Sequence, residues 1–148
     1  MSPLPLLALP PRARELLAVE VTDGEDLRSM RTQLHRFLEA DQPDQAGLDD
    51  VAQRVALVAT ELAGNALRHG LPPVVVRLLR DEDCYFLDAS DQDPHRAPEP
   101  AAREQPVNAG GRGLHIVHAL AQQLCWYSNG GTKHVWASFP FRAEREAS

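Results

Sequence analysis

The sequence predicts an α+β two-layer sandwich, in which a mixed, mainly antiparallel sheet is covered on one face by three helices. The first observation is the order of predicted elements along the 148-residue chain: strand, two helices, two strands, a long loop, a helix and two strands. The second is that most strands follow one another in pairs joined by short turns, as antiparallel hairpins do. The third is a hydrophobic content of 43%, which suits one core in one domain.

The chain begins with a proline-rich segment, residues 1–14, that we expect to form a flexible, irregular arm. The run ELLAVEV over residues 15–21 predicts a strand. Thr22 and Glu25 have the spacing of the N-cap and N3 residues of a capping box. Apolar residues at helical spacing then predict a first helix that ends near Ala40.

A longer helix is predicted over residues 48–69, because its apolar residues keep one stripe along that whole length. Gly70 follows the stripe, and a glycine at this position commonly ends a helix. Two apolar runs, residues 73–79 and 85–90, are separated by an acidic turn. They predict a β-hairpin.

The segment from Asp91 to Ala109 predicts a long loop. It contains four of the twelve prolines, and Val107 is its one large aliphatic residue. Loops of this length inside a compact domain are usually functional.

A third helix is predicted from Gly110 to about Leu124. Residues 126–141 contain a turn of Asn-Gly-Gly between two apolar runs and predict a second hairpin. A polar tail, residues 142–148, follows it. We therefore expect a single domain over residues 15–141.

The charge composition excludes several classes of function. A net charge of −6 without a basic stripe argues against nucleic acid as a direct partner. Lys133 is the single lysine, and it is preceded by Gly-Gly-Thr rather than by the residues of a Walker A loop. A lysine early in the chain, which a eukaryotic-type protein kinase needs, is absent. Phosphate binding would therefore depend on backbone amides, arginine or a metal ion.

The two cysteines, Cys84 and Cys125, lie in apolar runs, which favours reduced thiols in the core. The N-terminal segment lacks the basic start of a signal peptide, and no apolar run approaches the roughly 18 residues of a membrane-spanning helix. We expect a cytoplasmic protein without membrane contact.

Glu61 and Asn65 lie four residues apart and therefore on one face of the long predicted helix. An amide oxygen is a suitable ligand for Mg²⁺, and a carboxylate one turn away could orient a water or a hydroxyl. Taken alone, a solvated polar helix face explains the same pattern.

Asp91 ends a predicted strand where the long loop begins. A carboxylate there could accept a hydrogen bond from an exocyclic amine, although aspartate also begins many turns. Asp88 is a rival inside the strand, and we favour Asp91. The glycine-rich segment 110–114 would expose amides at a helix N-terminus, where a phosphate can bind, and Arg112 would add positive charge. A glycine-rich turn alone is weak evidence.

In order and spacing these pieces resemble the N box and the two glycine boxes of the Bergerat ATP-binding fold, the GHKL superfamily. The likeness consists of ELAGNALRHG, a strand ending in SDQDP, a proline-rich segment, GGRGLHIVHALA and a terminal GGTKHVW hairpin. It covers roughly residues 15–141. Within the superfamily, the chain most resembles the anti-sigma-factor serine/threonine kinase-like ATPases of bacteria.

The resemblance implies ATP and Mg²⁺ as ligands. It implies that Asn65 coordinates the metal, that Glu61 acts as the general base and that Asp91 accepts a hydrogen bond from the adenine amino group. The residues implied to border the phosphates are Gly111, Arg112, Gly113 and Leu114. Thr132 corresponds to a threonine near the adenine, and residues 92–109 correspond to a lid over the ATP.

The resemblance also shows one departure. The first glycine box of many relatives reads D-x-G-x-G, whereas Asp91 is followed by Gln92, Asp93 and Pro94. The missing glycines would stiffen the entry to the lid, and Asp93 adds negative charge near a nucleotide. The departure weakens the expectation of tight ATP binding.

The resemblance implies a regulatory protein kinase that phosphorylates a small, STAS-like anti-sigma antagonist and sequesters a sigma factor or a similar partner. Relatives are often dimers, so a homodimer is expected. An alternative is an ATP-gated protein-binding module without phosphotransfer activity. A detached catalytic domain of a histidine kinase and a purely structural α+β domain are further alternatives.

Overall fold

The computed structural model describes residues 4–42, 48–93 and 113–141. Its elements are β1 (Arg14–Val21), α1 (Gly24–Asp41), α2 (Leu48–His69), β2 (Val74–Arg80), β3 (Cys84–Asp91), α3 (Gly113–Leu120), β4 (Gln123–Asn129) and β5 (Thr132–Pro140). This order confirms the predicted one. The predicted lid beyond Asp93 and the polar tail lie outside the described residues.

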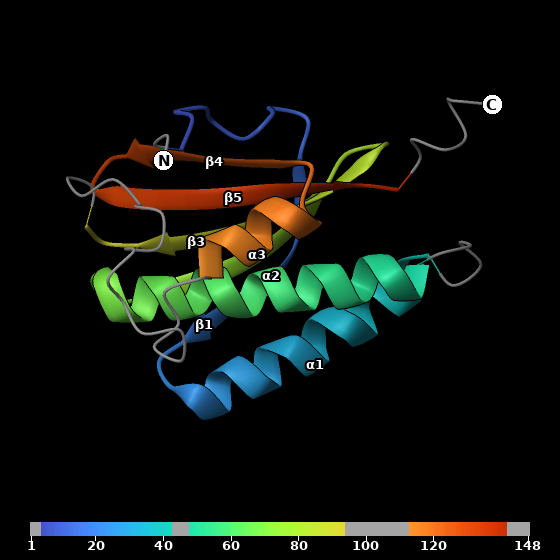
Figure 1. Cartoon of the computed structure of the whole chain (residues 1–148), viewed down its shortest axis with the longest axis horizontal. Helices are drawn as coiled ribbons and strands as arrows, with labels where there is room; N and C mark the ends of the chain where they lie inside the picture. The colour runs from blue at the N-terminus through green and yellow to red at the C-terminus, as the bar shows by residue number, and fades with distance from the viewer. Residues whose placement is uncertain (1–3, 43–47, 94–112, 142–148) are drawn as a thin grey trace.

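The five strands form one sheet in the order β1-β2-β3-β5-β4, and all neighbouring strands are antiparallel. The two predicted hairpins are β2–β3 and β4–β5. A parallel contribution comes from an isolated bridge between Leu6 and Trp126. The buried residues of α1, α2 and α3 share one core with one face of the sheet (Figure 1), which confirms the α+β two-layer sandwich.

The opposite face of the sheet carries a second, smaller apolar cluster. Its buried members are Leu79, Phe86, Cys125 and Trp136. The N-terminal arm runs along the β4 edge of the sheet, where Leu7 N donates to Trp126 O (2.9 Å) and Leu7 O accepts from Trp136 Nε1 (2.8 Å). Leu9 and Ala13 of the arm then pack against the second cluster. The arm is irregular as expected. Its described part, residues 4–13, is attached to the sheet rather than free.

Helix α1 begins one residue later than the capping box predicts. The N-cap residue is Asp23, whose side chain accepts a hydrogen bond from Asp26 N at 2.9 Å. In return, Asp26 Oδ2 accepts from the backbone N and the hydroxyl of Thr22. The assignment of Thr22 and Glu25 as cap and N3 residues was therefore wrong by one position. Both candidate pairs consist of capping residue types, so the spacing alone did not distinguish them.

Helix α3 ends at Leu120, about four residues before the predicted end. Gln122 N donates to Ser138 O (2.8 Å), and Gln123 pairs with Ser138 in the sheet. Leu124 is apolar and suits either a helix or a strand, and pairing with β5 decides for the strand. Among the described residues, every helix is too short or too polar to cross a bilayer.

Candidate functional site

The C-terminal end of α2 lies beside the end of β3 (Figure 1). Gly70 N donates to Ala66 O (2.8 Å) and closes the last turn of the helix. Gln92 N then donates to Leu71 O at 2.8 Å, and Leu71 N lies 3.5 Å from Asp91 Oδ1. The helix that carries Glu61 and Asn65 therefore ends beside Asp91.

Gly70 is required at this junction because the two segments approach closely. A Cβ atom on Gly70 would overlap the carboxylate of Asp91. The described glycines with positive φ are Gly130 and Gly131, in the β4–β5 turn, so Gly70 does not act through a left-handed conformation. The predicted helix end is confirmed, and its physical reason is space for a carboxylate.

The side chain of Asp91 is 2% exposed, and its contacts hold it in a defined orientation. Its Oδ1 accepts from Asp93 N at 2.8 Å, and its Oδ2 lies 3.4 Å from Lys133 Nζ. Lys133 is itself buried and directly opposite Asp91 in the β3–β5 pair. The ammonium compensates a carboxylate whose burial as an isolated charge would be very unfavourable.

Thr132 lies next to this pair, at the first position of β5. Its hydroxyl donates to Gln92 Oε1 at 3.2 Å. Thr132, for which a place near the adenine stays a prediction, is thus connected to the residue that follows Asp91.

The rival carboxylate, Asp88, faces the other side of the sheet. It is fully buried, and it accepts from Arg77 Nε at 3.0 Å and contacts His134 Nδ1 at 3.0 Å. The ring of Tyr127 stacks on His134, with centroids 4.5 Å apart. Burial and the nearby Asp88 carboxylate raise the pKa of Tyr127. Asp88 belongs to a structural network, which agrees with the preference for Asp91.

Glu61 and Asn65 are half-buried on α2, with the buried Gly64 between them. The side chain of Arg68 folds back along the helix, so that a Cβ on Gly64 would lie 3.3 Å from its Nη1. Within the described parts of the chain, the carboxylate of Glu61 and the amide of Asn65 make no hydrogen bond. The amide oxygen of Asn65 is a suitable ligand for Mg²⁺, so Asn65 fits the implied metal, and Glu61 lies one turn away on the same helix.

The second glycine box is only partly described. Gly113 is the first residue of α3, and α3 packs against α2. Gly111 and Arg112 lie outside the described residues, as does the side chain of Leu114. Their roles toward the phosphates stay predictions.

A model of the histidine kinase-like ATPase domain matches residues 21–139 of the chain. The chain belongs to this family. The matched region extends from the last residue of β1 to the penultimate residue of β5 and includes all three helices. A comparison with curated proteins found no match. The histidine kinase-like ATPase domain is an ATP-binding module of the GHKL superfamily, which agrees with the predicted fold and the predicted ATP ligand.

Sequence reasoning missed two residues of the site in this ATPase domain. Gly70 was interpreted only as a helix end, and Lys133 was used only to exclude other ATP-binding motifs. The signal for Lys133 was its place as the single lysine, one residue after Thr132. The signal for Gly70 was its position at the end of the N box. Their contacts with Asp91 depend on tertiary structure.

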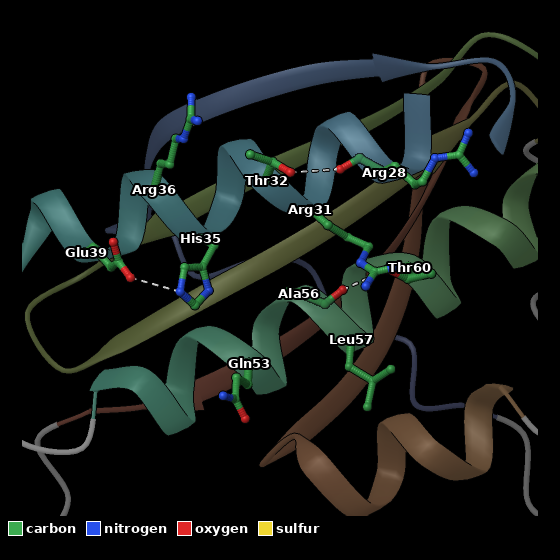
Figure 2. A pocket seen from close by; sticks show the side chains of 10 residues that line it. All are labelled: Arg28, Arg31, Thr32, His35, Arg36, Glu39, Gln53, Ala56, Leu57 and Thr60. Atoms are coloured by element: carbon green, nitrogen blue, oxygen red, sulfur yellow. Dashed lines mark hydrogen bonds and ion pairs between the residues drawn. The ribbon is translucent and has the colours of Figure 1, made fainter. Parts of the chain in front are cut away.

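A separate groove lies between α1 and α2 and contains no residue of the predicted site (Figure 2). Arg28, Arg31 and Arg36 contribute to its lining, and His35 pairs with Glu39 at 2.9 Å. Leu57, also in the lining, is 44% exposed. The groove is a feature of the helical layer and not a part of the Asp91 site.

Proposed function

We propose that this ATPase domain is a regulatory serine/threonine protein kinase of the anti-sigma-factor type. It phosphorylates a small antagonist protein and sequesters a sigma factor or a comparable partner in the alternate state. The observation that carries the proposal is the junction between α2 and β3, where the helix bearing Glu61 and Asn65 ends against the buried carboxylate of Asp91. The carboxylate proposed to recognise adenine and the carboxylate proposed to act as the general base thus belong to one connected unit.

The proposed reaction transfers the γ-phosphoryl group of ATP to a protein hydroxyl. The hydroxyl oxygen attacks the γ-phosphorus, the bond to the β–γ bridging oxygen breaks, and ADP leaves. Glu61 accepts the proton of the hydroxyl. Asn65 would hold Mg²⁺, which supplies charge neutralisation at the phosphates. Arg112 and the amides of Gly111 and Gly113 stabilise the phosphate charge.

The proposed partners are a STAS-like antagonist that carries the acceptor serine or threonine and a sigma factor. The proposal includes a homodimer and a cytoplasmic location. The net charge of −6 supports a protein partner over nucleic acid.

One feature of the chain favours the alternative, an ATP-gated binding module without phosphotransfer. Asp91 is followed by Gln92, Asp93 and Pro94 instead of the glycines that many relatives have at this place. In this alternative, nucleotide binding changes affinity for the partner but no phosphoryl group moves.

Two measurements test the proposal. Calorimetry should show Mg²⁺-dependent binding of ATP in preference to GTP, and Asn65→Ala should abolish the dependence on Mg²⁺. Single-turnover transfer from labelled ATP to a serine-bearing STAS antagonist should be lost in Glu61→Gln, while ATP affinity stays within about twofold of the wild type. Transfer that persists in Glu61→Gln would remove Glu61 as the base. Binding without any transfer in the wild type would favour the alternative.

A further inference from the structure

Asp91 and Lys133 form a buried ion pair between the interior strands β3 and β5, at the end of these strands where α2 also ends. The two residues are direct partners across β3 and β5, and their charged atoms are 3.4 Å apart. Their side chains are 2% and 6% exposed. This is the single lysine of the chain, and it lies within the candidate nucleotide site.

The contacts divide the two oxygens of Asp91 between different partners. Oδ1 faces the backbone amides of Asp93 and Leu71, whereas Oδ2 faces Lys133 Nζ. The carboxylate is therefore prevented from rotating. An ammonium has three N–H donors, so Lys133 can keep its contact with Asp91 while it donates to a second acceptor.

The pair places a hydrogen-bond acceptor beside a hydrogen-bond donor. The Watson–Crick edge of adenine has the opposite order, because the 6-amino group donates and the adjacent ring nitrogen N1 accepts. In guanine the same two positions are an acceptor and a donor, so guanine in the same orientation would set its carbonyl oxygen against the carboxylate. Proteins that recognise an unpaired base commonly use hydrogen bonds to this edge.

We propose that Lys133 is a second base-recognising residue, which donates to adenine N1 while Asp91 accepts from the 6-amino group. The inference rests on the proposed binding of ATP at this site. It extends that proposal, because both Asp91 and Lys133, and not Asp91 alone, would form hydrogen bonds with the adenine edge.

The first experiment compares ATP with 1-deaza-ATP, in which a C–H replaces N1. Calorimetry on the wild type should show about tenfold weaker binding of 1-deaza-ATP, the effect of losing one hydrogen bond to a charged donor. Lys133→Met should bind ATP about tenfold more weakly and should no longer distinguish the two nucleotides. Lys133→Arg should keep part of the discrimination, since it keeps the charge and the donors.

Controls separate base recognition from mere positioning. Arg36→Met removes a cation on α1, far along the helical layer, and should leave both affinities unchanged. If Lys133→Met weakens both nucleotides equally while the wild type does not distinguish them, Lys133 only positions Asp91 and the inference is overturned. If the wild type binds no ATP at all, the proposed function fails together with this inference.

A second readout needs no nucleotide. Lys133→Met leaves a buried carboxylate without its cation, so the urea midpoint of this variant should be lower than that of the wild type. Asp91→Asn should also lower the midpoint, because it leaves a buried ammonium without its anion. The double variant Asp91→Asn/Lys133→Met removes both charges and should lose less than the sum of the single variants. Additive losses would show that the pair does not form and would overturn the inference.

Discussion

Two aspartates three residues apart in β3 have different surroundings, because the strand turns alternate side chains to opposite faces. Asp88 contacts Arg77 and His134 beneath the N-terminal arm side of the sheet, whereas Asp91 lies beside Gly70 and Lys133. The side chains of odd- and even-numbered positions of this strand therefore lie on opposite faces of the sheet. The site uses one face, and the network that stabilises the sheet uses the other.

Asp88→Asn should destabilise the fold without affecting nucleotide recognition. The substitution leaves Arg77 and His134 without a buried negative charge, and we expect a loss of about 3 kcal/mol in the free energy of unfolding. Urea denaturation measures this loss, and ATP affinity should change less than about twofold. Asp91→Asn is the matched comparison: it should also be less stable, but it should lose about tenfold or more in ATP affinity. A tenfold loss of ATP affinity in Asp88→Asn would contradict the assignment.

Gly70→Ala should disturb Asp91 more than it disturbs the helix. The added methyl group overlaps the carboxylate, so the Asp91 side chain, α2 or the end of β3 must shift. We expect about 1–3 kcal/mol of destabilisation and weaker ATP binding. Gly24→Ala provides a control, since a Cβ at that position meets nothing within 4 Å. Equal behaviour of the two variants in calorimetry and in denaturation would refute the close-approach explanation.

At the scale of elements, the two ends of α1 depend on different kinds of contact. The start depends on local contacts, in which Asp23 and Asp26 cap the first turn with Thr22. The end depends on tertiary contacts: Asp41 Oδ2 accepts from Tyr85 Oη at 2.6 Å and from Arg80 Nη1 at 2.7 Å. Burial and the hydrogen bond to Asp41 raise the pKa of Tyr85. The helix therefore continues to Asp41, where it is attached to the β2–β3 hairpin.

Because of the cap of α1, the stability of the fold should fall as the pH becomes acidic. Hydrogen bonds from the hydroxyl and the amide of Thr22 hold the pKa of Asp26 below its usual value. A lowered folded-state pKa contributes stability that is present above the unfolded-state pKa, about 3.9, and is lost as the pH falls through the folded-state value. Asp26→Asn should therefore lower the thermal midpoint at pH 7 and have a smaller effect near pH 3. A difference that is the same at both pH values, or that Glu25→Gln reproduces, would contradict this explanation.

At the scale of the whole molecule, the arm gives the second face of the sheet an apolar cover of its own. One face is covered by the helices, and the other is partly covered by the later part of the arm. Leu4 belongs to the core on the helical face, and Leu7 is hydrogen-bonded to Trp126 and Trp136. Leu9 and Ala13 pack against the cluster that contains Cys125. A segment without regular structure thus completes the second core.

Removal of residues 1–13 should expose this second core. Burial raises the pKa of the Cys125 thiol, which is 3% exposed, so alkylation of the intact chain should be slow. In the truncated chain, the rate of iodoacetamide labelling should rise about tenfold, because the thiolate becomes accessible. A Cys84→Ser background restricts the measurement to Cys125. Unchanged labelling would show that the arm does not protect this face.

Much of the architecture followed from short-range patterns. Helical periodicity located α2 from Leu48 to His69, and the turn residues located both hairpins. The errors fell where two local solutions were equivalent: the one-residue choice of N-cap before α1, and the choice of helix or strand for Leu124. Contacts within residues 22–26 decided the first choice, and pairing with β5 decided the second.

The sequence by itself determined the element order, the family and the residue types of the candidate site, because periodicity and motif spacing are local properties of the chain. The tertiary structure alone decided which side chains meet. The sheet order brings Lys133 opposite Asp91, the end of α2 brings Gly70 against the same carboxylate, and strand alternation sends Asp88 to the other face. These contacts join residues that are 21 to 46 positions apart in the sequence, and pairing between distant strands has no signature within any one of them.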